Sequence, residues 1–146
     1  MSNAPAQLFP RRDVDGRVVS LAELLLAGLA GTALGLAGLA LIDGVLSTIG
    51  LGEFGQASGW LVSILPALLY FDELRAWRPY GVRLLVAAVA AGVGIGLGLI
   101  AAAIVNTWPP ILSGTVGAAV AVLAYAPIWF VGVRWLTGHL GERRSA

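Results

Sequence analysis

Few side chains in this sequence could carry out acid–base, nucleophilic or metal chemistry. The chain has no cysteine, and its single histidine is His139. All nine basic residues are arginine, so no lysine amine is present to form a Schiff base. One histidine without thiolates cannot build the usual zinc, iron–sulfur or bis-histidine haem site in a single chain. The sequence contains no Gly-x-Ser-x-Gly, His-Glu-x-x-His or P-loop motif. We therefore expect no enzyme activity, no cofactor and no metal.

Three polar residues in apolar surroundings are the remaining candidates for a polar or transport site: Asp43, Asn106 and Tyr125. A carboxylate inside a membrane can belong to a proton or cation pathway, which is the hypothesis that Asp43 suggests. The alternatives are structural. Asp43 would be a solvated residue that ends a helix, Asn106 would belong to a tight turn before two prolines, and Tyr125 would pack within the fold.

The composition indicates a membrane protein. Of 146 residues, 58% are hydrophobic and only 12% are charged, and a soluble domain of this size could not bury so much apolar surface. Residues 84–133 contain no charge at all. That stretch can cross about 30 Å of hydrocarbon twice, at about 20 residues per helix. The net charge of +1 gives no reason to expect a nucleic-acid partner.

The apolar runs predict an all-α, polytopic membrane protein with a bundle of four transmembrane helices. The predicted spans are 19–42, 57–74, 83–105 and 113–136, between an N-terminal segment, 1–18, and a C-terminal tail, 137–146. Helices satisfy their backbone groups internally, as hydrocarbon requires, and these runs are too long for barrel strands of about 9–11 residues. The alternative that the first run is a secretory leader is disfavoured, because it exceeds the ~7–15 residues of a leader's apolar core.

The arginines predict the orientation. Three precede the first span, none lies in 43–56, three lie in 75–83, none lies in 106–112, and three follow from residue 134. Under the positive-inside rule both termini are cytoplasmic. Tryptophans at both predicted interfaces agree with this assignment. We expect a multi-pass protein of the cell membrane, and the use of arginine without lysine favours a prokaryotic plasma membrane.

Glycines and prolines divide the spans into two kinds. Spans one and three carry closely spaced glycines: Gly28, Gly31, Gly35 and Gly38, then Gly92, Gly94, Gly96 and Gly98. Small residues let helix backbones approach closely in lipid, so we expect these spans to be central and to touch each other or a second copy. Spans two and four carry interior prolines, Pro66 and Pro127, which predict kinks. The repeated order is compatible with an internal duplication or with two unrelated hairpins.

A charged cluster lies between the second and third spans: Asp72, Glu73, Arg75, Arg78 and Arg83. Arginine pairs bidentately with phosphate, so contact with cytoplasmic lipid headgroups is the first interpretation. A docking surface for a protein partner is the second. Neither interpretation calls for catalysis.

Taken together, these features predict a non-enzymatic integral membrane protein. Its partners would be the lipid bilayer and either further copies of itself or another membrane protein. It would act by helix packing, as a homo-oligomer or as a small subunit of a membrane assembly. A small channel or transporter for an ion or small solute is the alternative, supported by the prolines, the possible repeat and Asp43.

Overall fold

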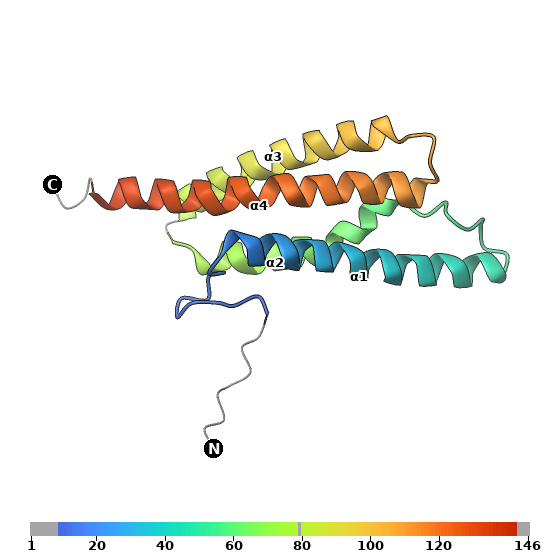
Figure 1. Cartoon of the computed structure of the whole chain (residues 1–146), viewed down its shortest axis with the longest axis horizontal. Helices are drawn as coiled ribbons and strands as arrows, with labels where there is room; N and C mark the ends of the chain where they lie inside the picture. Colours follow the sequence, from blue (N-terminus) through green and yellow to red (C-terminus); the bar gives the residue numbers. More distant parts are fainter. Residues whose placement is uncertain (1–8, 79, 143–146) are drawn as a thin grey trace, which may run out of the picture.

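The fold is known from a computed structural model, which describes residues 9–78 and 80–142 (Figure 1). The predicted all-α class is confirmed. Four α-helices and one short 3₁₀ helix follow in the order α1 (Leu21–Thr48), η1 (Gly59–Ser63), α2 (Ile64–Ala76), α3 (Tyr80–Ile104) and α4 (Pro110–Glu142). An isolated antiparallel bridge joins Arg12 to Val18 ahead of α1.

Three helices are long and apolar enough to cross a membrane: Leu21–Thr48, Tyr80–Ile104 and Pro110–His139. The second predicted span differs, because η1 and α2 together replace the single helix predicted over 57–74 and α2 has only 13 residues. The η1–α2 segment runs back alongside α1, and α3 and α4 then run out and back again (Figure 1). The chain therefore makes two antiparallel hairpins.

A serine N-cap fixes the start of α1. The hydroxyl of Ser20 accepts a hydrogen bond from the backbone N–H of Glu23 (3.2 Å), which satisfies one of the free donors at the helix N-terminus. The Glu23 carboxylate forms an ion pair with Arg11 ahead of the helix. At the other end α1 continues six residues beyond the predicted boundary at 42, to Thr48. Asp43 therefore lies inside the helix and does not end it.

Pro66 does not interrupt a long helix as the sequence predicted. It is the third residue of α2, and the chain changes from 3₁₀ to α geometry just before it, between Ser63 and Ile64. A proline in the first turn costs little, since the N–H groups there have no partner within the helix. Pro127 lies inside α4.

The central helix is α4, which packs against α3, α1 and η1. Of the two contacts expected for the first and third spans, the one with each other is not made, since α1 and α3 do not pack extensively on each other, and the one with a second copy stays a prediction. Small residues permit the contacts of α4. A Cβ at Gly117 would lie 2.8 Å from the carbonyl oxygen of Gly98, and one at Gly114 would lie 2.8 Å from the Cα of Gly59. Close backbone packing thus centres on the fourth span.

The eight glycines of α1 and α3 that were predicted to pack separate into two groups. Five face neighbouring elements closely enough that an added Cβ would approach another heavy atom to 3.2 Å or less: Gly28, Gly31, Gly35, Gly94 and Gly98. The other three have nothing within 4 Å of an added Cβ: Gly38, Gly92 and Gly96. Only the first group therefore packs inside the chain.

The closest approach of α1 to the backbone of a neighbouring element is at Gly35. A Cβ there would lie 2.7 Å from the carbonyl oxygen of Val62 and 3.0 Å from its Cα. Pro66, four residues after Val62, has no N–H to donate to that carbonyl. A close Cα approach at Gly35 offers the carbonyl a weak C–H contact in place of the missing donor.

We predict that Gly35→Ala destabilises the fold by about 1–3 kcal/mol, because its methyl group would overlap backbone that cannot rotate away. The matched control is Gly38→Ala, whose methyl group meets nothing within 4 Å. Unfolding of the purified protein in mixed micelles by increasing SDS measures both variants. Equal midpoints for the two variants would contradict this account of the α1–η1 contact.

Candidate functional site

The end of the molecule that carries the arginines is organised around one buried carboxylate. Glu73, in the last turn of α2, is 0% exposed. Its Oε2 accepts a hydrogen bond from the backbone N–H of Val18 (2.9 Å), and its Oε1 accepts one from Nε1 of Trp77 (3.0 Å). The guanidinium of Arg12 lies 3.8 Å from Oε2. A buried charge is tolerated when it is paired and hydrogen-bonded in this way.

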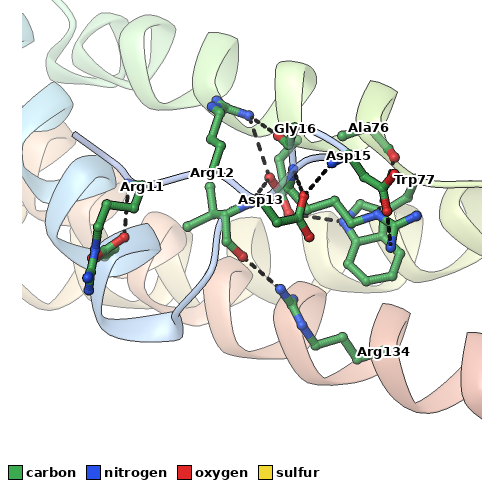
Figure 2. A network of polar contacts seen from close by, with 12 residues as sticks. Arg11, Arg12, Asp13, Asp15, Gly16, Ala76, Trp77 and Arg134 are labelled. Carbon is green, nitrogen blue, oxygen red and sulfur yellow. Dashed lines mark hydrogen bonds and ion pairs between the residues drawn. The ribbon is translucent and has the colours of Figure 1, made fainter. Parts of the chain in front are cut away.

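Arg134 of α4 completes the attachment of the N-terminal segment (Figure 2). Its Nη2 donates to the carbonyl oxygen of Val18 (2.7 Å), so both backbone groups of Val18 are bound. The guanidinium groups of Arg17 and Arg134 also lie 4.3 and 5.0 Å from the ring centroid of Trp77, within the range of cation–π attraction. Residues 11–18 are thereby held across the ends of α2 and α4.

Arg83 joins the start of α3 to the end of α2. It is only 8% exposed, and its Nη1 donates to the carbonyl oxygens of Trp77 (2.9 Å) and Leu74 (3.3 Å). A cation placed on the last carbonyls of a helix satisfies free acceptors and complements the helix dipole. Its Nε has no acceptor among the residues that the structure describes.

The burial of two members corrects the prediction for the charged cluster. Glu73 and Arg83 are buried and use their polar atoms within the chain, so they are not headgroup or partner contacts. Asp72, Arg75 and Arg78 are exposed and remain available for such contacts. The buried pair forms a structural network and offers no reactive group.

The opposite end of the molecule contains Asp43, which is also buried, at 8% exposure. Its Oδ2 accepts a hydrogen bond from the backbone N–H of Gly55 (2.6 Å), and the Gly55 carbonyl accepts one from the N–H of Ile111 (3.1 Å). The carboxylate therefore ties α1 to the loop after it and, through that loop, to the start of α4. This corrects the expectation of a solvated residue.

The predicted polar site is not assembled. Asn106 is exposed in the connection between α3 and α4, whereas Tyr125 lies midway along α4 and stacks on Tyr70 with 4.4 Å between ring centroids. Tyr125 lines a cavity that includes neither Asp43 nor Asn106. These three residues thus serve three separate parts of the fold.

That cavity is an apolar groove of about 580 Å³ between η1–α2 and α3, with α4 as its floor. Tyr70 fixes one wall, because its hydroxyl donates to the carbonyl oxygen of Val122 (3.1 Å). The groove arises because α3 packs on α4 without packing extensively on α2. Its lining comes from η1–α2 (Trp60, Ser63, Ala67, Tyr70, Phe71, Leu74), α3 (Ala91, Gly94, Ile95, Leu99) and α4 (Ala118, Ala121, Val122, Tyr125).

Sequence reasoning missed this groove, although one wall has a readable pattern. Lining residues follow steps of three and four from Trp60 to Leu74, which is the spacing of a single helix face. At one end the Trp60 ring lies so near Gly98 and Gly117 that a Cβ on either would come within 2.9 Å of it. The groove therefore depends on glycines that admit a tryptophan between α3 and α4.

No protein-family model, curated protein or solved structure matches this chain. The groove and the two polar networks are accordingly interpreted from their own geometry.

We predict that Glu73→Gln lowers the free energy of unfolding by about 2–3 kcal/mol, since hydrogen bonds to a buried charged group are worth that order of energy. An amide has one acceptor oxygen, so the N–H of Val18 or of Trp77 loses its partner. The Val18 amide should also exchange its hydrogen faster, as measured by mass spectrometry. Asp72→Asn, next in sequence but exposed, is the control and should change neither quantity. Unchanged exchange at Val18 in Glu73→Gln would refute the anchoring role of this carboxylate.

Proposed function

We propose that this chain is a non-enzymatic, multi-pass protein of the cell membrane that acts by helix packing, as a homo-oligomer or as a small subunit of a larger membrane assembly. Three long apolar helices support its placement in a membrane. Large hydrophobic side chains are exposed on every helix, among them Leu34, Leu68, Ile100 and Val131. A bilayer or a neighbouring apolar helix is the environment that such a surface requires.

One observation carries the packing role: α3 uses only one of its two small-residue faces inside the chain. Gly94 and Gly98 pack on α4, whereas Gly92 and Gly96 are open. Positions two residues apart lie about 200° apart around a helix, so the open pair is on the opposite side. Small residues four apart favour close helix association in lipid, and Ala88, also exposed, extends the open face by one turn.

The proposed orientation places both termini and the 75–83 connection in the cytoplasm, and η1–α2 acts as the second crossing. Figure 1 supports this, because the start of α1, the α2–α3 connection and the end of α4 lie toward the same end of the molecule. That end carries the three arginine groups. The connection that contains Glu53 and the one that contains Thr107 lie toward the other end, which carries none.

The channel or transporter alternative loses one of its three supporting features. The carboxylate of Asp43 is engaged by the Gly55 N–H. The groove beside α4 is apolar along its walls and is not continuous with that carboxylate. A helix-packing role therefore remains the better proposal.

The orientation predicts how single cysteines react in a chain that has none of its own. Thr107→Cys should react with a membrane-impermeant maleimide added to intact cells, and Gly81→Cys should react only after permeabilisation. Both positions are exposed, so accessibility within the fold is matched. Labelling of Gly81→Cys from outside, or equal labelling of both, would contradict the proposed crossing pattern.

The packing role predicts crosslinks through the open face of α3. In a homo-oligomer, Gly92→Cys and Gly96→Cys should each give a disulfide-linked dimer when an oxidant is added to native membranes, because close helix contact brings equivalent positions together. The control is Leu34→Cys, midway along α1 and 66% exposed, which should not. Gly92→Leu should reduce oligomer or complex formation without changing expression.

Size-exclusion chromatography with light scattering and native mass spectrometry provide the second readout. A complex whose mass is a multiple of one chain identifies a homo-oligomer, and any other mass identifies a subunit of a mixed assembly. A lone monomer in mild detergent, together with no crosslinked product from membranes, would overturn the proposal.

A further inference from the structure

The apolar groove is about as long as the hydrocarbon tail of a membrane lipid. Along η1–α2 its lining extends from Trp60 to Leu74, which at the helical rise is about 20 Å. One leaflet of the hydrocarbon core is about 15 Å thick, half of the ~30 Å total. A groove of this extent can receive the hydrocarbon tail of one lipid along most of its length.

The volume of the groove suits a lipid chain. The groove offers about 580 Å³, which lies within the ~300–1,000 Å³ typical of small-ligand sites. A narrow, unbranched hydrocarbon chain is an occupant of that size.

Positive charge is concentrated where the groove meets the arginine end. Phe71 lines the groove, and the guanidinium of Arg75, one turn further along α2, lies 4.5 Å from the Phe71 ring centroid. Arg75 is exposed. Arg83 binds the carbonyl of Leu74, the last groove residue on α2. A headgroup at this mouth would meet a free guanidinium backed by a second, buried cation, which favours a phosphate.

We propose that the groove binds one anionic phospholipid, with an acyl chain between α2 and α3 and its phosphate at Arg75. The lining is almost entirely apolar, as an acyl chain requires, and the exposed guanidinium of Arg75, which lies over the ring of the lining residue Phe71, has the sign that attracts an acidic headgroup. This inference rests on the proposed placement in a membrane. It does not depend on oligomerisation through the open face of α3.

The test uses full-length protein in phosphatidylcholine nanodiscs with a minor fraction of phosphatidylglycerol that carries a diazirine near the end of one acyl chain. After illumination, peptide mass spectrometry locates the labelled residues. Label should concentrate on groove positions of α3 and α4, such as Ile95 and Ala121. The same probe with a choline headgroup should give about fivefold less label there, the difference that one arginine near the membrane surface provides.

Two pairs of variants test the binding of the acyl chain and the binding of the headgroup separately. Ala91→Phe fills the groove and should abolish groove labelling, whereas Val93→Phe, an exposed position about 200° further round α3, should not. Arg75→Gln should lower phosphatidylglycerol labelling about fivefold, and Arg75→Lys should retain it. Ala67→Phe fills the groove from the α2 wall and replaces Ala91→Phe if that variant does not fold.

The possible results are distinct. Label spread evenly over all exposed helix faces, or equal loss in Val93→Phe and Ala91→Phe, would overturn lipid binding in the groove. Equal labelling by the two headgroup probes would overturn the choice of an anionic lipid. A second protein chain that crosslinks to Ile95→Cys and excludes the probe would identify a protein occupant and overturn the proposal. Failure of the chain to insert into nanodiscs would instead refute the membrane placement itself.

Discussion

Close contact between backbones along α4 is the constraint on which the rest of the structure depends. In a bilayer, hydrocarbon competes equally for apolar side chains, so helices associate through dispersion at short range and not through expulsion of water. Gly114 and Gly117 permit that range by leaving space for Gly59 and Gly98 of the neighbouring elements. Larger side chains at these points would separate α4 from η1 and from α3 together, because α4 packs on both elements.

Buried charged side chains act at the two ends of this apolar framework. Glu73 and Arg83 are buried at one end, and Asp43 is buried at the other. Each binds backbone groups that no helix satisfies. Glu73 accepts from the N–H of Val18, Arg83 donates to the last carbonyls of α2, and Asp43 accepts from the N–H of Gly55. Such groups are costly to leave unpaired away from water. The charges therefore attach loops to helix ends, and dispersion holds the helices themselves.

The sequence predicted the helical class and the long apolar helices, because both depend on composition along the chain. It could not identify α4 as the central helix. When every face of a helix is apolar, periodicity does not indicate which face packs, so Gly94 and Gly92 look equivalent until α4 is placed beside one of them. Glu73 and Asp43 resembled solvated charges for a related reason, since their partners are backbone groups distant in sequence. The groove is likewise a property of three elements together, and only the Trp60–Leu74 face hinted at it.

The one-sided packing of α3 links these observations to the environment of the protein. In water, an apolar groove of about 580 Å³ would expose surface at a cost of roughly 25 cal/mol per Å², and selection would favour closing it. In a bilayer the surrounding solvent is itself hydrocarbon, and an acyl chain fills the space without that penalty. The proposed acyl chain would therefore fill the gap between α2 and α3, beside the well-packed α3–α4 pair.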